Sequence, residues 1–370
     1  MQRIDHPLPW SPTGTSRHLS VLRYGSGPCK AYIQASLHAD ELPGMRVAVE
    51  LRRRLQQLES AGRLTGVIEL VPVANPIGLS QLFQAAVQGR FEFASGRNFN
   101  RDFVDLAAAV AAHVEGHLGS DEASNVRLIR RAMNEALDAL PAPASELEGM
   151  QRLLLRHACD ADIVLDLHCD FEAAVHLYSA PQHWPALRPL AARLQAGAVL
   201  LAEDSGGSSF DEACAMPWQR LRQRFPEAEI PLACLATTVE LGGMADTEAE
   251  RAVASAEAIL AFLAERGLIA GDWPAAPEHC CEATPFAGAQ YALAPHPGVV
   301  SFFKQPGEWV EHGEALFEVI DPLSEQHSIV RAETCGVLYA RERMRFARPG
   351  LWLAKVAGAT PIRQGRLLSD

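Results

Sequence analysis

The stretch "DIVLDL" (residues 162–167) decides the predicted fold of this chain. It is a run of apolar and β-branched side chains bounded by charge, which is typical of a strand buried in the centre of a sheet. A histidine, His168, follows it directly. Strands of an open α/β sheet deliver functional side chains at their carboxyl ends, so His168 is a candidate functional residue.

Further apolar strands alternate with amphipathic helices up to about residue 270. Strands are expected at 31–37, 66–75, 173–179 and 233–241, and helices at 45–58, 106–118, 121–138, from Ser145 onward, at 185–201, and from a Thr247/Glu250 cap to Gly267. Residues 77–105 carry few periodic apolar positions and are expected to form an ordered loop. This alternation predicts an α/β fold in which helices cover both faces of the sheet.

The pattern changes after about residue 270. The stretch "GDWPAAPEHCCEATPFAG" (271–288) is rich in Pro, Ala and Gly and is expected to be a linker. Short β-runs with turns and no helix follow it, up to about residue 360. We therefore expect two domains, at residues 1–275 and 285–362.

Composition excludes several classes of function. The 370 residues carry a formal net charge of -12, and such a surface repels a phosphate backbone, so a nucleic-acid partner is not expected. No run of about 18 apolar residues is present, so no membrane partner is expected either. The first residues lack the pattern of a signal peptide, and the eight cysteines are irregularly spaced. These features predict reduced thiols in a cytoplasmic protein.

Three polar residues besides His168 lie where predicted strands end. In "ASLHADELPG" (35–44), His38 and Glu41 lie three apart after the first strand, and Glu240 ends the strand at 233–241. Two histidines and one carboxylate match a catalytic zinc site that keeps one coordination position for water. From these residues alone, an ordinary polar turn and a buried core histidine remain alternatives.

The stretch "HVEGH" (113–117) is a competing metal motif. It places His113 and His117 four apart, so they would face one ion on a helix. The zincin motif needs a glutamate after the first histidine, but Val114 occupies that position, and Gly116 weakens a helix. A solvated alanine-rich segment is the favoured interpretation.

The stretch "SGRNFNRDF" (95–103) crowds two arginines and two asparagines together. The planar guanidinium of Arg97 or Arg101 suits a carboxylate, so this loop could hold the anionic end of a substrate. A structural pairing with Asp102 or Asp105 is the alternative. Arg90, in "QGRFEF", would lie on the surface by default.

Taken in order, His38-x-x-Glu41, Asn75-Pro76, "NFNR" (98–101), "DLH" (166–168) and "VELGG" (239–243) resemble the succinylglutamate desuccinylase/aspartoacylase family over about residues 28–265. That family belongs to the zinc carboxypeptidase-like group. The resemblance implies a three-layer α/β domain with a mixed sheet as the catalytic domain.

The resemblance also implies the roles of individual residues. One Zn²⁺ per chain would be bound by His38, Glu41 and His168, with Glu240 as the general base. Asn100 and Arg101 match the family pair that holds the substrate carboxylate. Arg90 would polarise the scissile carbonyl, with Arg97 as the alternative. Many members read Asp-Leu where this chain has Asn98-Phe99.

Residues 295–323 resemble half of a biotinyl/lipoyl-like domain. The hairpin that presents a cofactor lysine in carrier domains reads Asp321-Pro322-Leu323 here, without a lysine. The resemblance therefore implies a small all-β barrel-sandwich domain that forms a lid or channel wall at the active site.

The sequence favours a zinc-dependent amidohydrolase that acts on a small N-acyl amino acid, with homo-oligomerisation left open. Asp170, in "HCDFEAAVH", could bind an amine-bearing substrate, although a carboxylate that only supports the site is an equal alternative. A metallocarboxypeptidase acting on peptides is the first alternative function. A non-enzymatic binding or carrier protein built on the lipoyl-like domain is the second.

Overall fold

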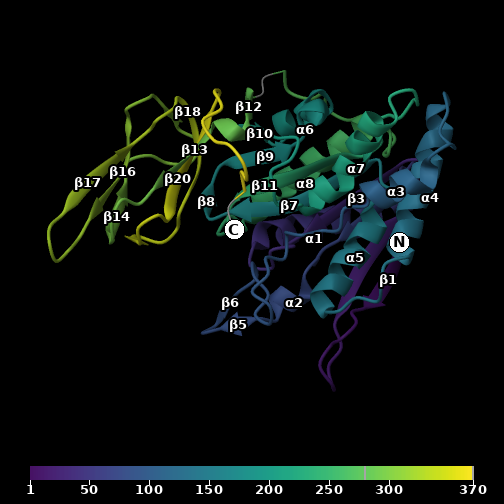
Figure 1. The fold of residues 1–370 in the computed structure, drawn as a ribbon, viewed down its shortest axis with the longest axis horizontal. Coiled ribbons are helices and arrows are strands. Elements are labelled where there is room, and N and C mark those ends of the chain that lie inside the picture. The colour runs from purple at the N-terminus through teal and green to yellow at the C-terminus, as the bar shows by residue number, and fades with distance from the viewer. Residues whose placement is uncertain (279–280, 369–370) are drawn as a thin grey trace.

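A nine-stranded mixed sheet forms the larger part of the computed structural model, which describes residues 1–278 and 281–368 (Figure 1). Its strands, in spatial order, are β1 (Gln2–Pro7), β2 (His18–Tyr24), β4 (Val67–Val71), β3 (Lys30–Ala35), β7 (Ile163–Asp170), β11 (Leu235–Gly243), β9 (Val175–Ser179), β10 (Ala198–Leu201) and β12 (Ala283–Pro285). β7 is the middle strand and runs parallel to both β3 and β11. The predicted central strand at 162–167 is therefore confirmed.

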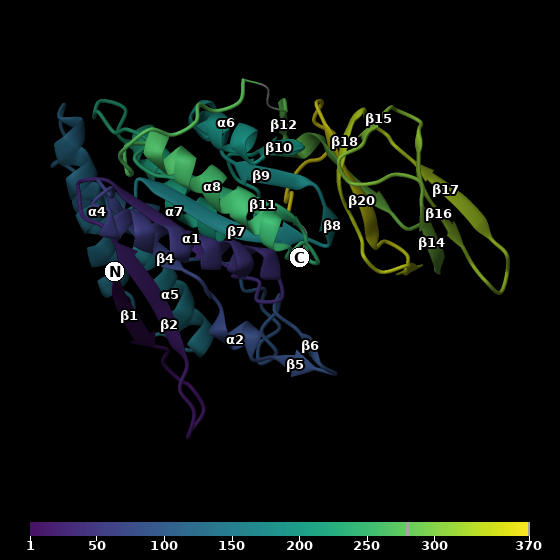
Figure 2. The same ribbon diagram turned by 180° about the vertical axis from the view of Figure 1, so that it is seen from behind.

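Helices cover both faces of this sheet. One face carries α1 (Leu42–Ser60), α6 (Trp184–Arg193) and α8 (Ala249–Glu265), and the other carries α3 (Ala107–Val114), α4 (Glu122–Asp138), α5 (Glu146–Ala158) and α7 (Phe210–Arg224). Figure 2 shows α1 and α8 side by side on the first face. Along β7, Ile163 and Leu165 pack toward this layer and Val164 toward the other. The strand period of two thus builds both cores, and the predicted layered fold is confirmed.

Several predicted elements match the structure. The helix expected at 45–58 is α1, and its apolar positions Val47, Leu51, Leu55 and Leu58 are all buried. Ser145 precedes α5, and its hydroxyl accepts a hydrogen bond from the backbone N–H of Glu148 at 3.1 Å. The loop expected at 77–105 holds only the short α2 (Pro76–Leu79), which begins one residue before it, and the small hairpin of β5 (Leu82–Phe83) and β6 (Ala86–Val87).

Three expectations were wrong. The helix predicted over 185–201 ends at Arg193, and its last residues form β10. Gln195, with φ of 54°, reverses the chain between the two elements. Helix α7 lies where no element was predicted, although Ser209 and Glu212 form a capping box at its start. Glu248, and not Thr247, is the N-cap of α8.

The C-terminal region is all-β, as expected, apart from the short 3₁₀ turn η2 (Phe286–Gly288) at its start. A similar turn, η1 (Pro181–His183), precedes α6. One sheet contains β13 (Ala289–Leu293), β20 (Trp352–Gly358), β18 (Gly336–Arg341) and β15 (Trp309–Val310); the other contains β17 (His327–Arg331), β16 (Ala315–Ile320), β14 (Gly298–Phe302) and β19 (Phe346–Ala347). Both sheets contribute to one apolar core. We call this region the β-domain, and it lies at one end of the large sheet (Figure 1).

Three connections join the β-domain to the large sheet. The first is the predicted linker, which contributes β12 to the edge of the large sheet just before the β-domain begins. Residues 279–280 of this linker, including Cys280, lie outside the described residues. β8 (Glu172–Ala173) follows β7 in the chain but pairs with β18 of the β-domain. After the last strand the chain returns to the loop that follows β10, where the N–H of Leu367 donates to the carbonyl of Ser205 at 2.9 Å.

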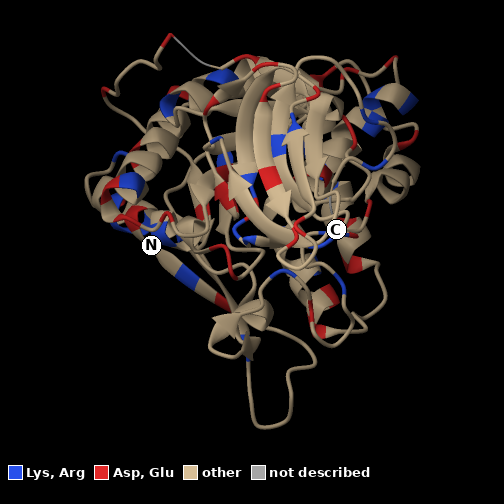
Figure 3. Ribbon diagram, turned by 90° about the vertical axis from the view of Figure 1, so that its left-hand side faces the viewer, with Lys and Arg blue, Asp and Glu red and all other residues tan. Residues whose placement is uncertain are grey.

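The charge distribution agrees with the composition. Figure 3 faces the β-domain and shows Lys and Arg interspersed with Asp and Glu along the ribbon. Within residues 1–278 and 281–368, no helix is both long enough and apolar enough to cross a bilayer.

Candidate metal and active site

His38 and Glu41 lie in the turn that joins the end of β3 to the start of α1. The N–H of Glu41 donates to the carbonyl of His38 at 3.1 Å, which closes the turn, and Glu41 is the N-cap of the helix. Pro43 lies in the first turn of α1, where its missing N–H is not needed. The Pro-Gly sequence after Glu41 therefore starts the helix and turns both side chains toward the carboxyl edge of the sheet.

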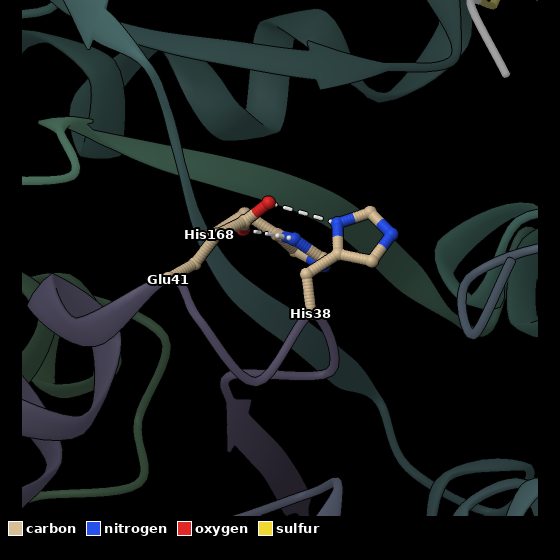
Figure 4. A group of neighbouring side chains, drawn as sticks. All are labelled: His38, Glu41 and His168. Atoms are coloured by element: carbon tan, nitrogen blue, oxygen red, sulfur yellow. Dashed lines mark hydrogen bonds and ion pairs between the residues drawn. The ribbon is translucent and has the colours of Figure 1, made fainter. Parts of the chain in front are cut away.

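The carboxylate of Glu41 lies between two imidazoles, as Figure 4 shows. Its Oε1 lies 2.8 Å from Nδ1 of His38, and its Oε2 lies 2.7 Å from Nδ1 of His168. All three side chains are buried, and one ligand atom from each lies within 4.8 Å of the others. Two imidazole nitrogens and a carboxylate oxygen are a donor set that fits zinc. The structure thus brings together the three residues that the sequence singled out.

The second nitrogen of each imidazole has its own hydrogen-bond acceptor. Nε2 of His38 lies 2.8 Å from Oδ1 of Asn98, and this oxygen also accepts from the backbone N–H of Asn100. Nε2 of His168 lies 2.9 Å from Oδ2 of Asp166. Both Nε2 atoms therefore donate, which leaves each Nδ1 lone pair for a metal. Such supporting acceptors orient metal-binding histidines. Sequence reasoning missed Asp166 and Asn98 in this role.

The electrostatics of the cluster favour a cation between these side chains. Burial opposes ionisation of Glu41, but the two histidines outweigh burial and hold the pKa of its carboxyl well below the usual range. Burial also opposes a charge on His168, but Asp166 and Glu41 raise its pKa well above the ordinary value. Burial and nearby Arg90 lower the pKa of His38 to about 4. The pKa shifts of Glu41 and His168 thus indicate that this buried cluster stabilises one positive charge beside the Glu41 carboxylate.

A cavity of about 320 Å³ opens over this cluster and includes both Glu240 and Arg90 in its wall. Glu240 lies on β11, in register with His168 on β7. Its Oε2 is buried and has no hydrogen-bond partner among the described residues, and burial together with Glu41 raises its pKa to about 8. Nη1 of Arg90 lies 3.5 Å from Oε1 of Glu41. A proton acceptor and a guanidinium thus face the same space as the three candidate ligands.

Asn100 and Arg101 also line the cavity, whereas Arg97 does not. The side-chain carbonyl of Asn100 accepts from the N–H of Phe210 at 2.9 Å, which fixes its orientation. Arg101 is buried, and burial and Arg90 lower its pKa to about 10. Arg97 is partly exposed, 3.8 Å from Asp102, as in the structural pairing considered for it. The geometry therefore favours Arg90 over Arg97 beside the cluster.

The remaining candidates have other surroundings. Asp170 lines the cavity, but its Oδ2 already accepts from Nζ of Lys355 at 2.6 Å, which leaves a weaker case for binding a substrate amine. His113 and His117 are both exposed, and α3 ends at Val114, so they do not share a helical face. The two histidines of "HVEGH" are thus solvated, as the favoured interpretation expected, but Val114 between them is buried in the core.

Comparisons with known proteins identify the family of this chain. The model of the succinylglutamate desuccinylase/aspartoacylase catalytic domain matches residues 29–266. A crystal structure of a protein of that family from Shewanella amazonensis SB2B is 26% identical, with a TM-score of 0.87 over 96% of this chain and 98% of that one. One from Shewanella frigidimarina NCIMB 400 is 24% identical, with a TM-score of 0.86 over 96% and 97%.

A more distant structure shows the same fold. The product-bound ectoine utilization protein EutE (DoeB) from Ruegeria pomeroyi is 16% identical, with a TM-score of 0.67 over 97% of this chain and 95% of that one. A search of curated proteins found no match.

Gly44 lets the Glu41 turn approach β7, and this contact can be tested. A Cβ at Gly44 would lie 2.8 Å from the carbonyl oxygen of Leu167, directly before His168. We expect Gly44→Ala to push α1 away from β7 and to lower the free energy of unfolding by about 1–3 kcal/mol, measured by urea titration, with weaker zinc binding. Gly119→Ala, where a Cβ meets open space, is the matched control. Unchanged zinc affinity in Gly44→Ala would refute the contact's role.

Proposed function

The chain belongs to the succinylglutamate desuccinylase/aspartoacylase family, and from this premise we propose that it is a zinc-dependent hydrolase of the amide bond in a small N-acyl amino acid. One observation carries the proposal. A buried His-Glu-His cluster shares a single cavity with a carboxylate and with two arginines. These groups are what an amide-hydrolysing site needs beside its metal.

His38, Glu41 and His168 would hold the zinc through two Nδ1 atoms and a carboxylate oxygen. The donor set and the acceptors on both Nε2 atoms support this assignment. When bound, zinc lowers the pKa of a water molecule to about 7 and polarises a carbonyl oxygen. His38 and His168 would bind the metal as neutral imidazoles, with the Nε2 proton of each held by its own acceptor.

Glu240 is the proposed general base. Its Oε2 is buried without a hydrogen-bond partner among the described residues, and the pKa of its carboxyl is raised to about 8, so it can hold a proton for part of the reaction cycle. It would accept a proton from the attacking water and return it to the nitrogen of the leaving amine. Water is thereby added across the amide, which gives a carboxylic acid and a free amine.

The arginines would handle the negative charges of the reaction. Arg90, beside Glu41, is placed to stabilise the oxyanion that develops on the scissile carbonyl. Arg101, with Asn100 fixed next to it, would bind the substrate carboxylate and so align the amide. A cavity of about 320 Å³ suits a small substrate.

The alternatives fit the cavity less well. A metallocarboxypeptidase acting on peptides needs room for a chain, but Tyr291, Glu342 and Trp352 of the β-domain wall this cavity. A carrier function needs a lysine at the hairpin tip between β16 and β17, and that tip reads Asp321-Pro322-Leu323. These residues support the proposed role of the β-domain as a wall of the active site.

The proposed function predicts a metal-dependent activity. We expect the purified protein to contain about one zinc per chain and to hydrolyse at least one member of an N-acetyl and N-succinyl amino acid panel. Removal of zinc by a chelator should abolish turnover, and added zinc should restore it. Release of the free amine is the measurement. Activity that survives complete loss of metal would refute the proposal, as would activity on peptides alone.

Glu240→Gln tests the general base. The amide cannot accept the proton, so kcat should fall by about 10²–10⁴-fold while zinc content stays at the wild-type level. Only the ionised carboxylate accepts a proton, so wild-type kcat/KM should fall as the pH drops through the pKa of Glu240. The residual rate of the variant should lack this acid limb. Near-wild-type turnover in Glu240→Gln would assign the base elsewhere.

Arg101→Ala tests the carboxylate contact. Loss of a charged hydrogen-bond donor should raise KM for carboxylate-bearing substrates by about 10- to 100-fold. The matched control is Arg97→Ala, which removes an arginine of the same loop that does not line the cavity. We expect it to leave KM unchanged. If Arg97→Ala raises KM and Arg101→Ala leaves KM unchanged, the two assignments would have to be exchanged.

A further inference from the structure

Four residues that lie shortly after His168 in the chain are held by the β-domain. We call residues 170–173 the bridging segment; it begins two residues after His168 and runs from the end of β7 through β8. Each of its residues has a partner in the β-domain. The segment therefore connects a candidate metal ligand to a domain that is distant in sequence.

The first contact is a buried ion pair. Nζ of Lys355, on β20, donates to Oδ2 of Asp170 at 2.6 Å, and both residues line the cavity. The ammonium also lies 4.0 Å from the ring centroid of Trp352 and 5.3 Å from that of Tyr291. Lys355 is only 5% exposed, so this pair is little screened by water.

The next contacts continue along the segment. The ring of Phe171 stacks on Trp352 with a centroid distance of 5.5 Å and an interplanar angle of 11°. Glu172 forms ion pairs with Arg341 and Arg345, both at 2.6 Å. Ala173 pairs with the β18 strand. Side-chain contacts at Asp170, Phe171 and Glu172 and strand pairing at Glu172 and Ala173 thus fix the same piece of backbone.

The other end of the segment is fixed to the metal cluster. The N–H of Cys169 donates to Oε2 of Glu41 at 3.1 Å, the same oxygen that faces His168. Asp170 also pairs with Gly243 at the end of β11, the strand that carries Glu240. A shift of Asp170 would therefore move the backbone of the adjacent Cys169 and, through it, that of His168.

We propose that Lys355 is a positioning residue for the metal site: by holding Asp170 it fixes the end of β7, and with it His168. This proposal rests on the proposed function, because it takes the cluster to be a zinc site. It gives the β-domain a role beyond that of a cavity wall. Lys355 acts through Asp170 and makes no contact with the reacting atoms.

Charge explains why the pair matters. Without Lys355, the carboxylate of Asp170, whose side chain is only 12% exposed, is left facing Glu240, and these like charges repel each other. An unpaired buried charge is strongly unfavourable, so Asp170 would move toward water and take the bridging segment with it. In an Asp170→Asn variant, residue 170 carries no charge, so this repulsion is absent whether or not Lys355 is present. The effects of changing the two residues should therefore not be additive.

The test is a double-mutant cycle in the full-length, zinc-loaded protein, with Lys355→Met, Asp170→Asn and the double variant. The readouts are the rate of zinc release to a chelator, kcat and KM. Lys355→Met should accelerate zinc release by about 10- to 100-fold and lower kcat, with little change in KM. In the Asp170→Asn background, the same substitution should change the release rate by less than about twofold. Lys304→Met, which removes another paired lysine of the β-domain outside the cavity, should leave all three readouts unchanged.

Three outcomes would overturn the proposal. The first is zinc release at the wild-type rate in Lys355→Met. The second is a release rate in the double variant that equals the product of the two single effects. The third is a rise in KM alone, which would mean that Lys355 binds substrate directly. If thermal melting shows that Lys355→Met does not fold, Asp170→Asn alone decides, because loss of the acceptor should also accelerate zinc release. Zinc release is measured without substrate. A wild-type protein that hydrolyses nothing would therefore defeat the proposed function and still leave this test decisive.

Discussion

The carboxylate of Glu41, buried between two imidazoles, is the interaction on which the rest of the site depends. A buried carboxylate is costly unless it is compensated, and here the N–H of Cys169 donates to it while the Nδ1 atoms of His38 and His168 lie beside its two oxygens, where a shared cation would bind all three. These partners come from the turn after β3 and from the end of β7. The parallel pairing of β3 with β7, and the close contact at Gly44, are therefore conditions for the cluster to form.

The parts of the fold that the sequence predicted are those set by local pattern. The apolar face of α1 has the helical period, and the run at 162–167 is β-branched, short and bounded by charge, as a buried strand is. His168 and Glu240 could be placed at strand ends for the same reason. That they lie side by side depends on the register of β7 and β11, which no local pattern contains.

The missed elements and contacts have physical reasons too. Residues 198–201 are a short apolar run after a helix, and such a run fits a helix and a strand equally well. Asn98 supports His38 from 60 residues away, so spacing could not reveal it. Asp166 could have been found, because side chains two apart on a strand share a face, and Asp166 lies two before His168.

The charges that line the cavity bear on the kind of substrate it accepts. Lys355 is paired with Asp170, and Arg90 and Arg101 are the arginines that the described residues place in the cavity wall. Burial and the charge of Arg90 lower the pKa of Arg101, which means that the two guanidinium groups repel each other in a poorly hydrated space. An anion bound in the cavity would offset this repulsion, whereas a neutral ligand would not. This relief of repulsion supports the carboxylate-bearing substrate proposed above.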